Sequence, residues 1–155
     1  MSLETVEILP AESSDHKLLT QITFEGKGFW GYSQTQLLSW KRDLTITSEY
    51  IEENEIYKLL LNGEIIGYYS YLMVAEMEIK LDYLFLSPKY IGKGYGKLLM
   101  LDFLLKVQAE APKRITLEAE PQAENFYKKF GFITYGKRES SIKDRFLPQM
   151  KLDLI

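Results

Sequence analysis

The spacing of apolar and polar positions along the chain predicts short strands and helices in mixed order. Alternating apolar residues predict a first strand over residues 4–9, which ends at Pro10. Two β-rich runs, residues 57–61 and 65–73, flank Asn62-Gly63, a strong short-range signal for a β-hairpin. Further strands are predicted over residues 79–86, 115–119, 133–137 and 147–154.

Apolar residues at helical spacing, together with capping residues, predict helices in four places. Ser13, Ser14 or Asp15 caps the first helix, which carries apolar residues at positions 18, 19 and 22. Ser33 caps the second helix, which runs through Trp40. The remaining helices are predicted over residues 96–110 and 123–130. Residues 24–33, rich in glycine and aromatic side chains, are expected to lie outside the first two helices.

Length and composition indicate one globular domain over residues 1–155. A chain of 155 residues, with 46% hydrophobic and 26% charged residues, can bury a core and does not resemble a disordered protein. The predicted order is one strand, two helices, three strands, a helix, a strand, a helix and two strands. This order is typical of the mixed α/β class.

Composition also disfavours several kinds of site. The chain has no cysteine, which excludes a thiol nucleophile, and its single histidine, His16, excludes multi-histidine metal sites, so we expect no metal. The net charge of −3 does not favour binding to nucleic acid or to an anionic membrane. The apolar runs are too short to cross a bilayer and no signal-peptide pattern is present, so we expect a cytoplasmic protein.

A glycine-rich turn follows the strand that ends at Leu86. Such a turn at the start of a helix presents unpaired backbone N–H groups at the positive end of the helix dipole, which suits a phosphate or pyrophosphate. Its spacing fits neither the P-loop nor the dinucleotide-binding fingerprint, and a connection without a ligand is the alternative. The strand residues are Leu84, Phe85 and Leu86, and the turn and first helical residues are Gly92, Lys93, Gly94, Tyr95, Gly96 and Lys97.

Two segments together resemble the GNAT acetyltransferase superfamily. The acetyl-CoA loop of that family, Q/R-x-x-G-x-G/A, falls on residues 91–96, with Ile91 in place of the usual Gln or Arg. Residues 115–132 are similar to the family's strand, turn and helix, which end in a Tyr-x-x-x-Gly-Phe signature at Tyr127, Gly131 and Phe132. A stretch around Arg145 resembles that of an uncharacterised prokaryotic branch of the family.

The resemblance implies a fold and a cofactor. The GNAT fold is a mixed, mostly antiparallel sheet of about six to seven strands flanked by about four helices. The resemblance implies that acetyl-CoA is bound and CoA released, with the pantetheine arm along residues 84–86 and the pyrophosphate on residues 92–97. A departure at Ile91 weakens this match without removing the site, because backbone amides do most of the phosphate binding in the family.

The resemblance also implies catalytic residues for direct attack of an amine on the thioester. Tyr127 matches the family's general acid, and a phenol with an ordinary pKa of about 10 is protonated at neutral pH. Glu118, near the end of its predicted strand, lies where some members place the proton acceptor. Asp82, Glu120 or an ordered water chain are the alternatives. No histidine pairs with a serine in any motif, so we expect no acyl-enzyme.

Acceptor specificity in the family comes from the first two helices, their connection and the C-terminal strands. In this chain Trp30 and Tyr32 in the connection and Arg145 near the C-terminus are the candidate acceptor-binding residues. The expected acceptor is an amine on a small molecule, a peptide or a protein, and both monomer and homodimer stay open. Two other functions are considered: a non-catalytic acyl-CoA-binding sensor or interaction module, and a nucleotide-binding protein.

Overall fold

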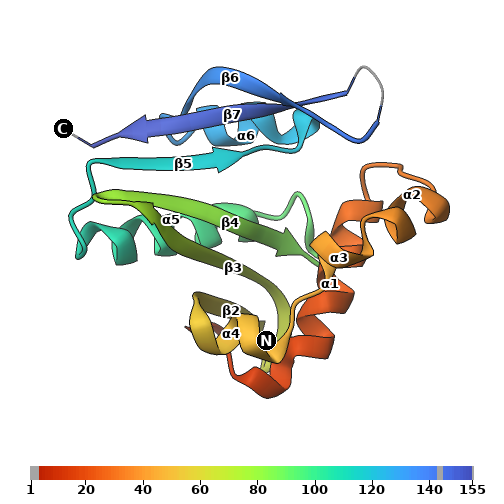
Figure 1. The fold of residues 1–155 in the computed structure, drawn as a ribbon. Coiled ribbons are helices and arrows are strands. Elements are labelled where there is room, and N and C mark those ends of the chain that lie inside the picture. The colour runs from red at the N-terminus through yellow and green to blue at the C-terminus, as the bar shows by residue number, and fades with distance from the viewer. Residues whose placement is uncertain (1–3, 143–144, 155) are drawn as a thin grey trace. The chain divides into compact units, whose positions relative to one another are not determined.

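The computed structural model describes residues 4–142 and 145–154, which form seven strands and six α-helices (Figure 1). The strands follow the spatial order β1-β2-β3-β4-β5-β7-β6. The β4–β5 pair is parallel, whereas the β1–β2, β2–β3, β5–β7 and β6–β7 pairs are antiparallel. This arrangement confirms the predicted mixed, mostly antiparallel sheet. Its strands are β1 (Val6–Pro10), β2 (Glu55–Leu61), β3 (Glu64–Ala75), β4 (Glu78–Leu86), β5 (Arg114–Glu118), β6 (Ile133–Glu139) and β7 (Phe146–Asp153).

The helices appear where the sequence predicts them, with two additions. The helices are α1 (His16–Gly28), α2 (Gln34–Ser39), α3 (Lys41–Leu44), α4 (Ser48–Glu53), α5 (Tyr95–Gln108) and α6 (Glu124–Lys128), with 3₁₀ turns η1 (Ser13–Asp15), η2 (Pro88–Tyr90) and η3 (Pro121–Ala123). Ser33 caps α2 as predicted, its hydroxyl accepting from the Gln36 N–H at 3.2 Å. The sequence prediction lacked α3 and α4, although Thr47 caps α4 in the same way, at 3.0 Å from the Tyr50 N–H.

The chain divides into two compact units, which are described separately. Unit 1 comprises Met1–Tyr71 and Tyr83–Lys106, and unit 2 comprises Leu72–Asp82 and Val107–Ile155. Strands β3 and β4 contribute residues to both units. The prediction of a single domain over residues 1–155 stays a prediction.

In unit 1, alternate residues of β3 point to helices on opposite faces of the sheet. On one face the Tyr68 hydroxyl lies 2.5 Å from the Thr23 hydroxyl of α1, and Ser70 bonds Tyr50 of α4 at 2.9 Å. On the other face the Tyr69 ring packs on Phe103 of α5, with centroids 5.6 Å apart. Because side chains alternate along a strand, β3 anchors both helical layers of this unit.

Helix α1 continues through a segment that the sequence analysis left outside it. Residues 24–28 are helical despite two glycines, and Gly26 is buried. A Cβ at Gly26 would lie 2.8 Å from the Phe85 ring and 3.1 Å from the Leu86 carbonyl oxygen. The glycine is therefore required by the close approach of α1 to β4, a tertiary reason that helix propensity alone does not reveal.

A second glycine, Gly67 of β3, also allows the end of β4 to approach closely because it has no side chain. A Cβ there would lie 2.6 Å from Leu86 Cδ2 and 2.8 Å from the Phe85 carbonyl oxygen.

We expect Gly67→Ala to lower the free energy of unfolding by about 1–3 kcal/mol, because the Phe85 backbone oxygen must move to make room for the new methyl group. Chemical denaturation measures the loss. Gly28→Ala is the matched control in the same unit, since its nearest neighbour, Leu37 Cδ1, is 3.4 Å away. Equal stability of the two variants would contradict the close approach.

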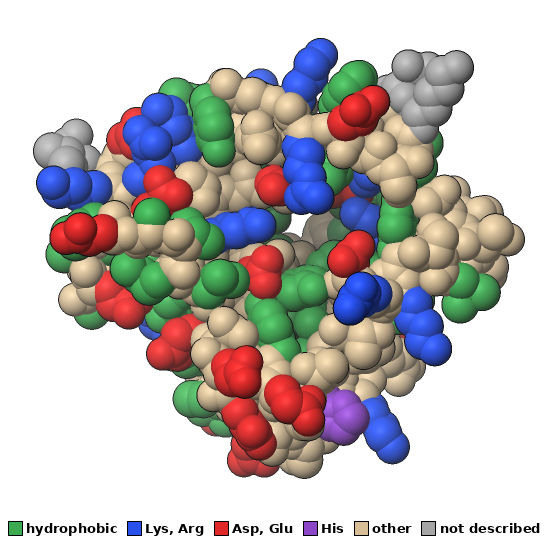
Figure 2. Space-filling view, in the orientation of Figure 1, with side chains coloured by type: hydrophobic (Ala, Val, Ile, Leu, Met, Phe, Trp, Pro, Cys, Tyr) green, Lys and Arg blue, Asp and Glu red, His purple; other side chains and the backbone are tan. Residues whose placement is uncertain are grey.

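In unit 2, β5 has one buried face and one polar face. Ile115 and Leu117 are buried, whereas Arg114, Thr116 and Glu118 on the opposite face keep partial exposure. Helix α6 is tied to β6 by a hydrogen bond of 2.5 Å from the Thr134 hydroxyl to Glu124. Basic and acidic side chains are interspersed over β5, β6 and β7 in the upper part of Figure 2. The polar faces of these strands thus carry charges of both signs.

Candidate active site

The glycine-rich turn of unit 1 has the backbone conformation that its glycines permit. Gly92 has φ +81° and Gly94 has φ +93°, values that other residues rarely adopt. A Cβ at either glycine would meet no atom within 4 Å, so these positions are not packed against other residues. The turn leads directly into α5, which begins at Tyr95. The sequence prediction of this strand, turn and helix is confirmed at these residues.

The turn and the start of α5 offer donors and positive charge. The N–H of Leu98 bonds the Gly94 carbonyl at 3.2 Å, and N–H groups N-terminal to it have no partner within the helix. Lys93 and Lys97 are exposed, and neither makes an ion pair within the part of the chain that the structure describes. The arrangement is suited to binding an anion at the helix N-terminus.

Tyr95 links the turn to the N-terminal strand region. Its hydroxyl donates to Glu4 at 3.4 Å, and its ring meets Tyr90 edge-on with centroids 6.0 Å apart. Desolvation and then the neighbouring Glu4 carboxylate raise the pKa of Tyr95 above its ordinary value. The phenol therefore stays neutral at physiological pH and adds no negative charge to the turn.

The end of β4, which precedes the turn, is fixed by close packing in unit 1. Leu86 is buried, while Leu84 and Phe85 are half-buried. The Ser87 N–H, just beyond the strand, donates to the Ile66 carbonyl at 2.8 Å. The glycines of α1 and β3 that touch Phe85 and Leu86 add to this restraint. Of the three strand side chains, only that of Leu86 is therefore fully enclosed.

Tyr127, on α6 in unit 2, has a fixed ring and an available hydroxyl. Its ring meets Phe126 and Phe132 edge-on, with centroids 5.1 Å and 6.2 Å away. Within residues 4–142 and 145–154 its hydroxyl makes no hydrogen bond. Desolvation by burial raises the pKa of Tyr127 above the ordinary phenol value. The group is therefore protonated at neutral pH, and its pKa lies above the ordinary value of about 10 given for it in the sequence analysis.

Two of the carboxylates predicted as proton acceptors, Glu118 and Glu120 in unit 2, are paired with cations. Arg138 Nη1 donates to both carboxylate oxygens of Glu118, at 2.9 Å and 3.3 Å, and Lys80 Nζ lies 3.9 Å from Glu118. Glu120 forms an ion pair of 2.8 Å with Arg145, and both side chains are about nine-tenths buried. Oxygens of both carboxylates therefore already accept hydrogen bonds from an arginine.

Arg145, predicted to bind an acceptor, is engaged inside unit 2. Besides its ion pair with Glu120, its Nη1 donates to the Ser140 hydroxyl at 2.7 Å. One backbone hydrogen bond, from the Ser140 N–H to the Arg145 carbonyl at 3.0 Å, also joins these two residues. These contacts give Arg145 a role in closing the turn before β7. Its role in acceptor binding stays a prediction.

The predicted acceptor residues Trp30 and Tyr32 belong to an aromatic cluster after α1 in unit 1. The Trp30 ring meets Phe29 at 5.2 Å, and the Tyr32 ring meets Trp40 at 5.0 Å, both edge-on. Lys27 Nζ lies 5.6 Å from the Tyr32 ring and 5.3 Å from the Trp40 ring. The sequence analysis did not predict that Trp40 and Lys27 join this cluster. A lysine and a tryptophan close to the glycine-rich connection were the signal that could have indicated a cation–π contact.

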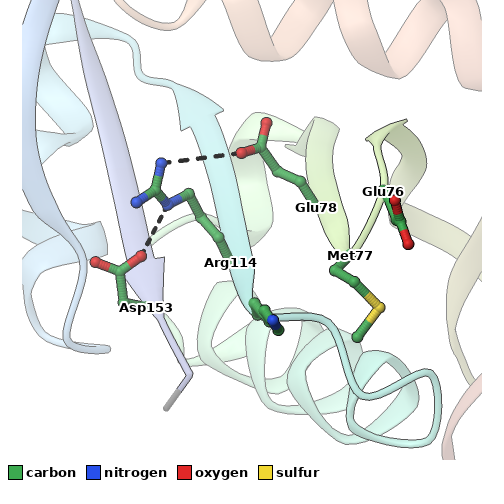
Figure 3. Close-up of a pocket in the computed structure, with 6 residues that line it drawn as sticks. Glu76, Met77, Glu78, Arg114 and Asp153 are labelled. Atoms are coloured by element: carbon green, nitrogen blue, oxygen red, sulfur yellow. Dashed lines mark hydrogen bonds and ion pairs between the residues drawn. The ribbon is translucent and has the colours of Figure 1, made fainter.

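A pocket that sequence reasoning did not find lies at the hairpin between β3 and β4 in unit 2 (Figure 3). Arg114 lies between two carboxylates, with Nε 2.8 Å from Asp153 and Nη1 4.0 Å from Glu78. The hydrogen bond from Arg114 holds the pKa of Asp153 below its ordinary value. The pocket is lined by Glu76, Met77, Glu78, Lys113, Arg114 and Asp153.

In residues 4–142 and 145–154, no group of three or more His, Cys, Asp or Glu side chains is arranged to hold a metal ion. Among the same residues, no helix has the length and apolar character needed to cross a bilayer.

Comparison with known proteins places the glycine-rich turn and the Tyr127 segment within one family match. A family model described as acetyltransferase (GNAT) domain matches residues 23–154 and thus extends through both units. Over 104 residues, the chain is 25% identical to an uncharacterized N-acetyltransferase, YafP, of Escherichia coli K12, covering 66% of this chain. Over 49 residues, or 32% of the chain, it is 45% identical to an uncharacterized N-acetyltransferase, ycf52, of Gracilaria tenuistipitata var. liui. These matches cover 63% and 27% of the two relatives, so the chain spans less than two thirds of either.

A solved structure supports the fold. The chain superposes on PaiA N-acetyltransferase of Thermoplasma acidophilum, crystallised with coenzyme A, with a TM-score of 0.79. The match covers 97% of this chain and 99% of that one at 20% sequence identity. At that identity the likeness shows a shared fold.

Proposed function

The chain belongs to the GNAT acetyltransferase family, and from this premise we propose that it transfers the acetyl group of acetyl-CoA to an amine. The observation that carries the proposal is the turn at Gly92 and Gly94, both at positive φ, which opens the N-terminus of α5. The open space around both glycines fits a diphosphate, because no Cβ keeps it from the backbone amides. A structural neighbour of the same fold was crystallised with coenzyme A, which adds support.

In the proposed reaction the amine attacks the thioester directly. The new C–N bond forms at the acetyl carbonyl carbon, the C–S bond breaks, and the thiolate leaves with a proton from Tyr127. The amine loses a proton, for which Glu118 is the first candidate acceptor and Asp82, Glu120 or water are alternatives. Backbone groups of residues 84–86 hold the pantetheine arm and the carbonyl oxygen. The bound thioester itself supplies the activated acetyl group.

Tyr127 suits the role of acid on geometric grounds. Two neighbouring rings fix its orientation, so little conformational entropy is lost when its hydroxyl meets a partner. The hydroxyl makes no hydrogen bond in the described part of the chain. Its raised pKa keeps it protonated throughout the neutral range.

A non-catalytic acyl-CoA-binding module is the second candidate. The pairing of Glu118 with Arg138 and Lys80 favours it, because both carboxylate oxygens already accept hydrogen bonds from Arg138. Both functions require CoA binding, and they differ in whether an amine is acetylated. The third candidate, a nucleotide-binding protein, is less favoured because such a protein has no need of the Tyr-x-x-x-Gly-Phe signature at Tyr127.

Calorimetry with CoA, followed by a thiol-release assay with acetyl-CoA and a panel of amines, tests the proposal. We expect CoA binding, release of thiol that depends on an amine, and no stoichiometric acetyl adduct on the protein by mass spectrometry. Absence of CoA binding would overturn both candidates. CoA binding without acetylation of any amine would favour the binding module, and a stable adduct on a serine or lysine would overturn direct attack.

A further inference from the structure

We propose that the acceptor amine carries a carboxylate a few bonds away, which Arg138 and Lys80 bind while Glu118 faces the ammonium group. This inference rests on the proposed function and names the substrate class for it. The observation behind it is an unequal distribution of charge between the two ends of the polar face of β5 in unit 2. At one end the cation Arg114 is matched by two carboxylates, whereas at the other end two cations, Arg138 and Lys80, share the carboxylate of Glu118.

At the first end, the charge of Arg114 is satisfied. It contacts Asp153 through Nε and Glu78 through Nη1, from the two strands that flank β5 (Figure 3). Lys151 of β7 also reaches Asp153, at 3.3 Å. Two carboxylates therefore face two cations, and this end of the strand presents no excess of positive charge to a ligand.

At the second end, Glu118 is shared by two cations. Arg138 uses only Nη1 in its contacts with Glu118, and within the described residues its Nε–H and Nη2–H groups have no hydrogen-bond partner. Lys80 approaches Glu118 at 3.9 Å, which is too long for a hydrogen bond. The side chain of Arg138 is 63% exposed. The three groups carry a net charge of about +1 with open donors.

The strand register explains how Arg138 reaches Glu118. Glu118 of β5 pairs with Gln149 of β7, and Arg138 of β6 pairs with Leu147 two residues away on the same face. Arg138 must therefore extend across β7. Gly136 lies opposite Gln149, and a Cβ there would come within 2.9 Å of Gln149 Oε1. The absence of a side chain at Gly136 therefore leaves room for the Gln149 side chain, which belongs to the strand that Arg138 crosses.

The open donors define the chemistry of the ligand. The free Nε and Nη2 edge of a guanidinium is the geometry that binds a carboxylate in bidentate fashion. Glu118, bonded to the same arginine at 2.9 Å, offers the opposite charge immediately beside it. A molecule with an ammonium and a carboxylate separated by a few bonds, such as an amino acid, complements all three groups. A diamine or the amino end of a peptide lacks the nearby anion.

Matched acceptors test the inference. Each common α-amino acid, and β-alanine, is compared with its carboxamide in the thiol-release assay, and ethanolamine is compared with O-phosphoethanolamine. We expect the carboxylate acceptors to be acetylated with a kcat/KM at least about tenfold above that of their carboxamides, the scale of one hydrogen bond to a charged group. Arg138→Gln should remove this preference, so that an acid and its carboxamide are used with similar kcat/KM. Lys80→Gln should remove part of it.

Arg114→Gln is the matched control, because it removes the same charge from the saturated end of the same strand. It should keep the carboxylate preference, and CoA affinity should be native in all three variants. Equal use of acids and amides, an unaltered preference in Arg138→Gln, or CoA binding with no amino acid acetylated would overturn the inference and leave the proposed function standing. A preference for O-phosphoethanolamine that depends on Arg138 would overturn the carboxylate assignment. Loss of CoA binding in the unaltered protein would instead refute the proposed function.

Discussion

Tyr127→Phe is expected to lower the turnover number by about 10²–10⁴-fold, the range associated with loss of a general acid. The phenylalanine ring keeps the edge-on contacts with Phe126 and Phe132, so the fold should be preserved. The Tyr127 hydroxyl makes no hydrogen bond in the described part of the chain, so the substitution removes no hydrogen bond there. The turnover number with a saturating acceptor is the measurement, with CoA affinity and thermal stability recorded beside it.

The control for this variant is Tyr135→Phe, which removes an equivalent hydroxyl from an exposed tyrosine on β6 of the same unit and should leave the turnover number unchanged.

The pH dependence of the rate is a second measurement on the same group. Because burial raises the pKa of Tyr127, its proton stays in place below about pH 10. The wild-type rate should therefore show no descending limb from this group in that range. A Tyr127→Phe variant with near-native turnover would show that another group, or water, supplies the proton.

Gly94→Val is expected to weaken CoA binding by about 100-fold or more. At φ +93° a β-branched residue is strained by an estimated 1–3 kcal/mol, and a side chain there would also stand where the diphosphate approaches. A Cβ at Gly94 would meet no atom within 4 Å in the free protein, so the fold itself should tolerate it. Calorimetry with CoA measures the effect, and Gly94→Ala should give a smaller loss.

Gly63→Val separates strain from ligand contact. Gly63 has φ +82° in the hairpin between β2 and β3, also with no atom within 4 Å of an added Cβ. It should lose stability to a similar degree while binding CoA with native affinity. Native CoA affinity in Gly94→Val would show that the turn at α5 does not hold the cofactor.

Local patterns in the sequence were sufficient for most of the elements and for the glycine turn. Asn62-Gly63 predicted the hairpin, and both residues have the positive φ that such a turn requires. Gly92 and Gly94 likewise adopt conformations that few other residues permit. These signals act within a few residues, so they can be read without knowledge of the fold. The Tyr127 spacing identified a residue through a family pattern, and its catalytic role stays a prediction.

The tertiary structure decided which side chains meet. The pairing of Glu118 with Arg138 spans a strand that lies between them in the sheet and follows both in sequence, so no periodicity indicates it. The extension of α1 through Gly26 likewise depends on the approach of Phe85, a residue far along the chain. Helix propensity and strand alternation are local free-energy preferences, whereas charge pairing and close packing depend on distances that exist only after the strands are ordered. The sequence alone therefore determined the framework and the glycine turn before α5, and the fold determined the partners of the charged residues.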